Sequence, residues 1–415
     1  MLHLNMTTTK TNLLTWPVII AALGYFVDIY DLLLFAIVRI QSLTDLGLNP
    51  DVVGTRILNF QMVGMLVGGI LWGVLGDKRG RLSTLFGSIV LYSAANFACG
   101  LLPYVPKEQV ADIYAWLRFF AGVGLAGELG AGITLVSESL PTKYRALGTS
   151  IVAGFGILGA VVAELTVNLA GSWSVAYLVG GLLGFALLLL RISVHESGIF
   201  ESAKKQKHLK HGDFTMMFTN KSRFIRYISC VAIGLPIWYC VGVLVFLANQ
   251  FGAAKGIAGV EPGKAIFWCY LLAAMGDLSS GPISYYLKSR RQAVFYFLLF
   301  TFVGVLLLLF SDYDSVGMYY FYCGWIGLGT GFWAMFVTLS AEQFGTNLRS
   351  TAATTIPNVV RGLVPLLLLS YEFLKAYFNP ILAVLLVGIL VFSFALIALH
   401  GTSETHERTL DFYEE

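Results

Sequence analysis

Seven ionisable side chains interrupt stretches of this sequence that are otherwise apolar, and their types indicate the chemistry they could support. Five are acidic and two are arginines: Asp28, Asp31, Glu128, Glu164, Asp277, Arg118 and Arg361. A charge placed in the centre of a bilayer costs at least about 2.5–3.5 kcal/mol, so such residues are usually functional. The acids outnumber the arginines, and burial favours the neutral form of an unpaired carboxyl group. We therefore expect some of these acids to bind and release protons.

The two acids of the first apolar stretch lie at the same depth as the arginine of the fourth. With a rise of 1.5 Å per residue, Asp28 and Asp31 lie about 20–24 Å from the start of their stretch, and Arg118 about 27 Å from the end of its own. Asp28 and Asp31 also share one helix face. We predict that Arg118 pairs with one of them and that protonation of that acid releases the arginine and permits a conformational switch. The alternative is a permanent ion pair that only fixes helix packing.

Two further acids differ in their surroundings. Glu128 is flanked by Gly127 and Gly130, and small residues let another helix approach closely. It is therefore a candidate gate or second proton site, or else a packed carboxylate bonded to a neighbouring helix. Glu164 lies near the outer end of its stretch, where we expect it to contact water.

A candidate substrate site combines arginines with aromatic residues. Asp277 and Arg361 both lie near mid-depth, where they could pair or contact a substrate, and Asn358 precedes Arg361 by one helical turn. Two arginines favour a substrate with a carboxylate, because the guanidinium fork matches that group with two hydrogen bonds. The candidate substrate-binding residues are Tyr25, Tyr30, Arg118, Trp238, Tyr239, Asp277, Trp333, Asn358 and Arg361.

The elements that must position these residues are membrane-spanning helices. Of the 415 residues 57% are hydrophobic and only 12% are charged, and the mean hydropathy is +0.75. Such a chain cannot cover its surface with charge, which excludes a cytosolic enzyme, a nucleic-acid-binding module and a disordered protein. A span needs about 20 apolar residues. The sequence predicts twelve spans, at about 15–38, 57–75, 82–102, 111–136, 146–170, 172–190, 227–250, 265–287, 292–310, 318–340, 351–373 and 381–400. Because backbone in lipid must satisfy its own hydrogen bonds, we expect an all-α membrane protein.

Basic residues predict the orientation and the division of the chain. Placing both termini in the cytoplasm puts 19 of the 27 lysines and arginines on that side, as the positive-inside rule requires. Six then lie outside: Arg39, Arg56, Lys107, Lys255, Lys264 and Lys375. The longest connection, 191–226, is basic and polar. It predicts an N-terminal six-helix bundle over 1–190 and a C-terminal six-helix bundle over 227–415, joined by this cytoplasmic loop.

Internal repeats support two pseudo-symmetric halves. The loop after span four contains Glu138, Thr142 and Arg145, and the loop after span ten repeats these types with the same spacing at Glu342, Thr346 and Arg349. The segment Gly73–Arg81 after span two has a weaker counterpart at 281–291 after span eight. Duplicated halves are how many transporters build a central site between two rocking bundles.

Several motifs resemble those of the major facilitator superfamily, and the similarity covers nearly the whole chain. The most specific is Gly73-x-x-x-Asp77-Lys78-x-Gly80-Arg81 between spans two and three. The run from Arg118 to Glu128, the loop with Glu138 and Arg145, and His195-Glu196-Ser197 also match. Asp28-Ile-Tyr30-Asp31 and Gly127-Glu128 are most similar to the metabolite:proton symporter branch, with sugar porters second. The chain departs from the family pattern at two places: Tyr285 stands where the second signature loop should have an acidic residue, and the prolines expected around Glu196 are missing.

The resemblance implies a cytoplasmic gating network. In this arrangement Asp77 caps the N-terminus of span eleven, which the helix dipole favours. The residues of the implied network, including the repeat partners in the second half, are Gly73, Asp77, Gly80, Arg81, Glu138, Arg145, Glu196, Glu342 and Arg349. The alternative, a solvated basic loop, explains the positive charges but not the spacing of the glycines and Asp77.

Together these patterns predict a proton-coupled symporter that imports a small polar metabolite, with a carboxylate-bearing organic acid favoured, by alternating access. The alternatives are a proton-driven exporter of a metabolite, siderophore or drug, a channel and, more remotely, a membrane-embedded enzyme. We expect no cofactor, no metal site and no nucleic acid, and a monomer in the bacterial inner membrane whose partners are its substrate, protons and the lipid bilayer.

Overall fold

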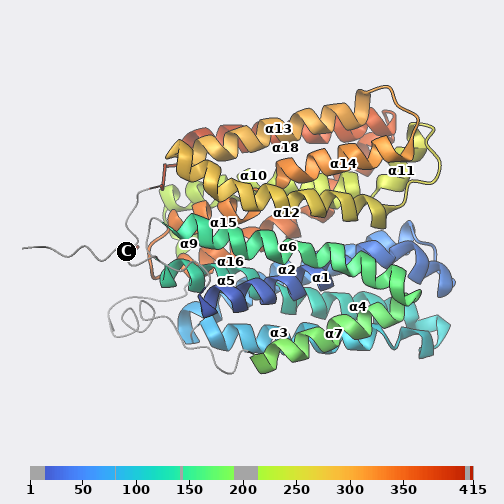
Figure 1. Cartoon of the computed structure of the whole chain (residues 1–415), viewed down its shortest axis with the longest axis horizontal. Helices are drawn as coiled ribbons and strands as arrows, with labels where there is room; N and C mark the ends of the chain where they lie inside the picture. The colour runs from blue at the N-terminus through green and yellow to red at the C-terminus, as the bar shows by residue number, and fades with distance from the viewer. Residues whose placement is uncertain (1–14, 80, 141–143, 191–213, 407–411, 415) are drawn as a thin grey trace, which may run out of the picture.

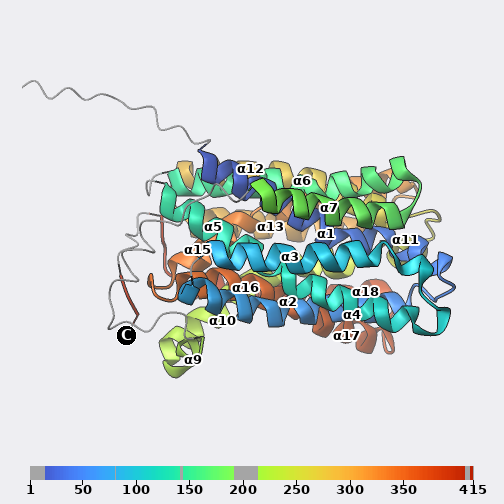
Figure 2. The same cartoon turned by 90° about the horizontal axis from the view of Figure 1, so that it is seen from below.

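The computed structural model describes residues 15–79, 81–140, 144–190, 214–406 and 412–414. Long helices run nearly parallel to one another along the longest axis of the molecule (Figures 1 and 2). The helices before residue 191 are α1 (Trp16–Asp45), α2 (Val52–Arg79), α3 (Arg81–Cys99), α4 (Lys107–Leu125), α5 (Glu128–Ser139), α6 (Arg145–Ala170) and α7 (Trp173–Leu190). Those after residue 213 are α9 (Met216–Thr219), α10 (Lys221–Tyr239), α11 (Ala248–Ala254), α12 (Pro262–Leu287), α13 (Arg290–Phe310), α14 (Val316–Thr330), α15 (Trp333–Glu342), α16 (Arg349–Gly362), α17 (Val364–Lys375) and α18 (Pro380–Gly401).

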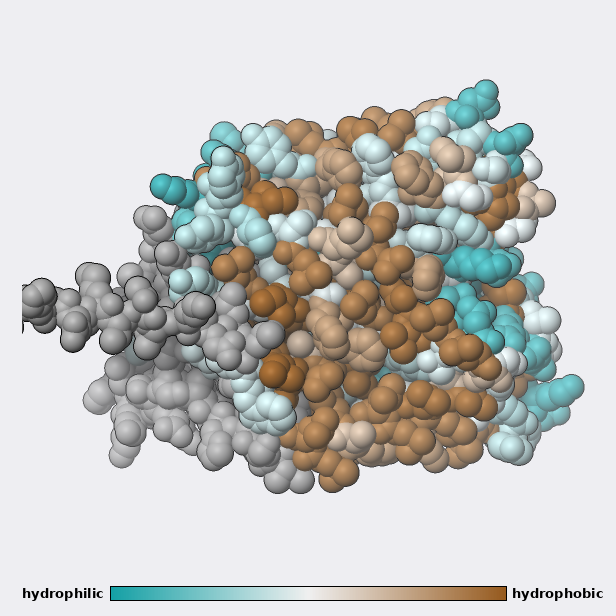
Figure 3. Space-filling view, viewed as in Figure 1, coloured by the Kyte–Doolittle hydropathy of each residue, from teal (hydrophilic) through white to brown (hydrophobic). Residues whose placement is uncertain are grey.

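Each of the twelve expected spans coincides with one helix or with consecutive helical segments. Among the described residues, nine helical stretches are long and apolar enough to cross a bilayer. The other three expected spans are α3, α4 followed by α5, and α12. Apolar side chains cover the middle of the molecule on the face shown in Figure 3, and hydrophilic residues gather towards the ends of the helices. This is a multi-pass membrane protein.

Two pairs of helices join the two groups along their length. α2 packs against α16, and α6 packs against α12. Counted along the chain, α2 and α16 belong to spans two and eleven, and α6 and α12 belong to spans five and eight. If spans seven to twelve repeat spans one to six, span eight corresponds to span two and span eleven to span five, so the two contacts are equivalent. Small residues allow the close approach: a Cβ atom on Gly154 of α6 would collide with Leu278 of α12.

Four of the spans are interrupted near their middle, which the sequence analysis did not foresee. Span four breaks between α4 and α5 at Ala126 and Gly127, and span ten breaks between α14 and α15 at Gly331 and Phe332. Span eleven breaks at Leu363. In span seven the α-helix contains Pro236 and continues as a π-helical segment over Cys240–Val245. Such breaks expose backbone groups within the membrane, where they can bind polar partners.

We call the end of the molecule at which α1 begins and α18 ends the terminal end, and the other end the opposite end.

α10 begins at Lys221, so span seven starts six residues before the predicted 227.

Candidate functional site

A small cavity lies between the two groups of helices, at the level of the helix breaks. It has a volume of about 30 Å³, which is room for one or two water molecules and far below the ~300–1,000 Å³ of sites that hold small-molecule ligands. Tyr25, Ile29 and Ile157 line it from the first group. The second group contributes Ile237, Trp238, Val241, Cys269, Tyr270, Ala273, Thr330, Trp333 and Arg361.

Arg361 is the charged residue among the cavity-lining side chains. It is 1% exposed, and its guanidinium carbon lies 5.5 Å from the centre of the Trp238 ring and 5.1 Å from that of Trp333. The planes of the two indole rings are inclined to each other by 68°, so the rings form an aromatic corner around the charge. Nη1 of Arg361 donates to Oδ1 of Asn358 at 3.2 Å. No acidic side chain of the described residues forms an ion pair with Arg361, so its charge is available to an anion in the cavity.

Asp277 caps a helix beside the cavity instead of pairing with Arg361. Its Oδ1 accepts a hydrogen bond from the backbone N–H of Ala334 at 3.1 Å, in the first turn of α15. A carboxylate at a helix N-terminus satisfies free N–H groups and is favoured by the helix dipole. Asp277 therefore stabilises the break in span ten that brings Trp333 to the cavity.

Two of the aromatic residues proposed for the substrate site point away from the cavity. The hydroxyl of Tyr30 donates to the carbonyl of Ala176 in α7 at 2.9 Å. That of Tyr239 donates to the carbonyl of Val384 in α18 at 2.7 Å. Both hydroxyls thus fasten helices of their own group, whereas Tyr25, Trp238 and Trp333 line the cavity as proposed.

A second buried polar cluster surrounds Arg118 within the first group. The guanidinium donates to Oε1 of Gln61 at 3.1 Å, to Oδ1 of Asn96 at 2.5 Å and to the backbone carbonyl of Asp31 at 3.0 Å. The depth match between spans one and four is therefore present, but the contact is through the backbone of Asp31. The Asp31 carboxylate is fully buried and lies within reach of the Arg118 guanidinium and the Asn96 amide.

The remaining acids are also buried. Asp28 is fully buried on α1, within electrostatic reach of the cavity residue Tyr25. Glu128 is 1% exposed and is the first residue of α5, directly after the break in span four. Glu164 was expected to contact water but is 7% exposed. It accepts a hydrogen bond from Asn168 and packs against Gly263 of α12, because the interface of the two groups extends over it.

Hydrogen bonds between the two groups close the cavity towards the terminal end. The amide Nδ2 of Asn358 in α16 donates to the backbone carbonyl of Ala126 at 2.8 Å. Nearer that end, the hydroxyl of Thr351 donates to the carbonyl of Gly73 at 3.4 Å, and Thr338 in α15 donates to Thr149 in α6 at 3.2 Å.

Arg39 closes the opposite end, although its position in the sequence led us to place it outside the membrane. It is fully buried in α1, where its guanidinium lies 4.3 Å from the centre of the Phe246 ring and donates to Oδ1 of Asn249 at 3.2 Å. At the same end, Nε2 of Gln250 donates a hydrogen bond to Oδ1 of Asp51 at 3.5 Å. The structure is therefore closed at both ends of the cavity.

Part of the implied gating network lies within the described residues. Gly73 faces Thr351 and Thr355 of α16, as the resemblance implies for a residue at the interface of the groups. Glu342 forms a buried ion pair with Arg290 at 3.0 Å, and Arg349 is 1% exposed at the start of α16. Gly80 and Glu196 and the side chains of four more network residues lie outside the described residues: Asp77, Arg81, Glu138 and Arg145.

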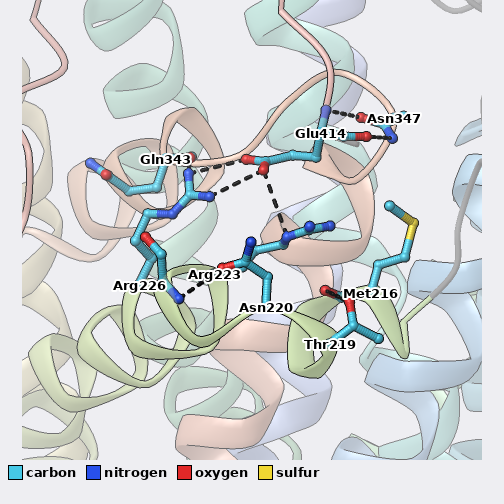
Figure 4. Close-up of polar contacts among 9 residues, drawn as sticks. Met216, Thr219, Asn220, Arg223, Arg226, Gln343, Asn347 and Glu414 are labelled. Carbon is cyan, nitrogen blue, oxygen red and sulfur yellow. Dashed lines mark hydrogen bonds and ion pairs between the residues drawn. The ribbon is translucent and has the colours of Figure 1, made fainter.

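The loop between Glu342 and Arg349 binds the C-terminal tail. Figure 4 shows the Glu414 carboxylate between two arginines of α10: it lies 3.0 Å from Arg226 and 3.7 Å from Arg223. Asn347 exchanges two hydrogen bonds of 2.9 Å with the backbone of Glu414. The N–H of Thr346 donates to the carbonyl of Phe412 at 2.8 Å. The tail thus satisfies polar groups that the loop alone would leave free.

Sequence reasoning missed Tyr270 in the cavity and Gln61 and Asn96 beside Arg118. Each carried a usable signal. Tyr270 lies seven residues before Asp277 and therefore on the same helix face. Gln61 and Asn96 are polar amides inside predicted spans, where such groups need a partner.

Comparison with known proteins agrees with this architecture. A sequence model of the Major Facilitator Superfamily matches residues 21–368. A putative metabolite transport protein of Haemophilus influenzae is 27% identical over 375 residues, covering 86% of this chain and 88% of its own. The niacin transporter NiaP of Acinetobacter baylyi is 30% identical over 184 residues, covering 43% of this chain and 40% of its own.

A solved structure shares the fold. The proton:xylose symporter XylE, bound to 6-bromo-6-deoxy-D-glucose, superimposes with a TM-score of 0.73 at 15% sequence identity, over 95% of this chain and 97% of its own. The family model covers most of the chain, and its relatives are transporters and not enzymes. The chain belongs to the major facilitator superfamily of membrane transporters.

Proposed function

We propose that this protein is a proton-coupled importer of a small organic acid, held by its carboxylate at Arg361 and moved by alternating access. The observation that carries this proposal is the position of Arg361: a buried guanidinium without an ion pair among the described residues, in a cavity between the two groups of helices. A buried arginine offers two parallel hydrogen bonds to a carboxylate, in surroundings where charge-assisted bonds are strong.

The walls of the cavity favour a flat, aromatic acid. Trp238 and Trp333 form an aromatic corner around the guanidinium, and Tyr25 and Tyr270 complete the ring-bearing wall. A planar ring can pack on these faces while its carboxylate binds Arg361. The name of the relative from Acinetobacter baylyi, a niacin transporter, supports a substrate of this kind.

Asp31 is our candidate for the proton-binding group. Its carboxylate is fully buried beside Arg118 and Asn96 and forms no ion pair within the described part of the chain. An ionised carboxylate in such a place is costly, whereas a protonated one is tolerated. We propose that a proton stabilises Asp31 in this closed conformation, and that ionisation draws its carboxylate towards Arg118. Asp28 and Glu128 remain candidates for a second proton site, and the proton coupling named for the XylE structure supports the general scheme.

The direction and orientation follow from the distribution of charge. By sequence position, most of the lysines and arginines belong to the segments expected on the side of the two termini, so we propose that the terminal end faces the cytoplasm. In this orientation the proposed division into an N-terminal bundle that ends at residue 190 and a C-terminal bundle that begins with α10, at Lys221 instead of the predicted 227, gives two moving halves. Arg39 then closes the outer entrance, and Asn358 and Gly73 close the inner one.

Uptake into proteoliposomes tests the proposal. Purified protein is reconstituted and supplied with radiolabelled nicotinate, with and without a pH gradient that is acidic outside, while protein-free liposomes measure passive entry. We expect uptake that needs the protein and exceeds equilibrium only with the gradient. Nicotinamide has the same shape without the charge and should not compete. Equal competition by nicotinamide and nicotinate, or competition by inorganic phosphate alone, would refute the aromatic carboxylate as substrate.

A further inference from the structure

Asn358 connects the cavity to the far side of the helix interface through one amide group. Its Oδ1 accepts from Nη1 of Arg361 at 3.2 Å, and its Nδ2 donates to the carbonyl of Ala126 at 2.8 Å and to that of Thr354 at 2.7 Å. Arg361 and Thr354 belong to its own half, whereas Ala126 belongs to the other half. Among the candidate substrate-binding residues of the second half, all of which the structure describes, Asn358 is therefore the side chain that forms a hydrogen bond to the first group of helices.

The cross-interface bond ends at the break in span four. Ala126 follows the last residue of α4, and Gly127 precedes α5, which begins with Glu128. Packing around the bond is tight, because a Cβ atom on Gly69 of α2 would lie 2.6 Å from Cβ of Asn358. Asn358 is 2% exposed, so water cannot replace Ala126 while the halves are together. Opening of the terminal end must break this bond.

We infer that Asn358 makes closure of the terminal end depend on whether Arg361 holds an anion. With the cavity empty, Arg361 donates to Oδ1 and polarises the amide, which strengthens the bond that Nδ2 makes to Ala126. An anion on the guanidinium competes with Oδ1 for Nη1 and so weakens the bond across the interface. Substrate then favours opening at the terminal end, because its interaction with Arg361 differs between the two conformations. Asn358 is thus a positioning residue and not a substrate ligand.

This inference rests on the proposed anion site, but it also makes a prediction for the empty protein. Removing the amide deletes a hydrogen bond that exists only when the terminal end is closed. Its loss should therefore favour the conformation open at that end. The equilibrium constant for opening should rise about two- to twelvefold if the bond has an ordinary net strength. The substrate should have little further effect, since the connection that it acts on is gone.

Cys269 provides a natural reporter of this opening. It lines the cavity and is buried, so a thiol reagent reaches it only after one end has opened. We propose to measure its alkylation by a membrane-impermeant maleimide in inverted membrane vesicles, with the modified residue identified by mass spectrometry. The full-length protein is compared with Asn358→Ala, Asn358→Asp and the control Thr355→Val. Thr355 is buried in the same helix, but its hydroxyl donates within α16, to the carbonyl of Thr351.

Without ligand, Asn358→Ala should raise the alkylation rate about two- to twelvefold, while Thr355→Val stays near the wild-type rate. Nicotinate should raise the wild-type rate but not that of Asn358→Ala. Asn358→Asp keeps the shape and cannot donate to Ala126, so it should match the alanine variant without ligand. Its carboxylate should also hold Arg361 and weaken nicotinate binding, which provides a second measurement if the alanine variant does not fold.

A wild-type alkylation rate in both Asn358 variants, or an undiminished response to nicotinate in Asn358→Ala, would overturn the inference. An equal rise in Thr355→Val would show that general packing, and not the amide, holds the end closed. If nicotinate has no effect on any variant while the ligand-free rise persists, the proposed substrate is wrong and the role of Asn358 in closure stands.

Discussion

Replacement of Arg361 by lysine is the sharpest test of the anion site. Lysine keeps the positive charge but replaces the planar fork by a single ammonium group, so a carboxylate loses one of two parallel hydrogen bonds. A hydrogen bond to a charged group contributes about 1.5–3 kcal/mol. At about 1.4 kcal/mol for each factor of ten, we expect nicotinate to bind about 10- to 150-fold more weakly to Arg361→Lys. Arg361→Gln removes the charge as well, and the loss of one partner from a buried charge pair costs about 2–5 kcal/mol, or about 30-fold to several thousand-fold.

Binding can be followed in detergent by titration calorimetry or by tryptophan fluorescence, since Trp238 and Trp333 flank the guanidinium. Arg226→Lys is a matched control, because Arg226 binds the tail at the terminal end and not the cavity. Its affinity for nicotinate should equal that of the wild type, and all variants should melt within a few degrees of one another. The reasoning is refuted if Arg361→Gln binds nicotinate within threefold of the wild type, or if the variants lose affinity for nicotinate and nicotinamide equally.

Four further variants test other parts of the molecule. Asp31→Asn should abolish accumulation driven by a pH gradient while leaving exchange of substrate across the membrane, measured as counterflow; intact accumulation would contradict its role as proton carrier. Arg39→Ala should raise alkylation of buried thiols in vesicles with the opposite end accessible, because it removes the bond to Asn249, and an unchanged rate would exclude Arg39 as the closing residue there. Glu414→Gln, whose ion pairs are partly exposed, should lower the melting temperature by roughly 1–3 °C; 0.5 M salt should narrow this difference, and a difference insensitive to salt would contradict an electrostatic origin. Burial would raise the pKa of Glu404, but hydrogen bonds from the Ser289 hydroxyl and the N-terminal backbone of α13 outweigh it and hold the pKa below its ordinary value. The stabilisation is therefore present at neutral pH and is lost as the pH falls through that lowered pKa. Glu404→Gln should accordingly melt below the wild type at pH 7, and the difference in melting temperature should shrink as the pH is lowered through the acidic range. A constant difference would argue against the assignment.

The positions of the spans could be predicted because hydropathy alone determines which stretches can lie in lipid. The approach of Arg118 to span one was also predictable, since the rise per residue converts sequence distance into depth. The atoms involved were not: the arginine binds the backbone carbonyl of Asp31 instead of its carboxylate. Depth specifies a level in the membrane, whereas the partner depends on helix rotation and on amides contributed by neighbours such as Gln61 and Asn96.

The helix breaks explain most of what the sequence did not reveal about the cavity. A glycine inside an apolar run, such as Gly331, is compatible with close helix packing or with an interruption, and one sequence does not distinguish the two. In a continuous helix the N–H of Ala334 would bond to a carbonyl of the preceding turn. The capping role of Asp277 depends on the break in span ten, which frees this N–H, and so could not be predicted from the sequence. Tyr30 and Tyr239 are aromatic residues of the kind expected in a binding site. Their side chains nevertheless point towards carbonyl groups of α7 and α18, to which their hydroxyls donate hydrogen bonds.

The small size of the closed cavity also bears on inhibition. A complete cycle must pass through a conformation sealed at both ends, so a cargo has to fit within walls that can still meet around it. Analogues with a carboxylate and a bulky extension should bind Arg361 through the carboxylate, while the extension prevents closure of the end through which they entered. Such compounds should behave as non-transported blockers, and those that enter from the opposite end should trap the protein with Arg39 and Asn249 apart.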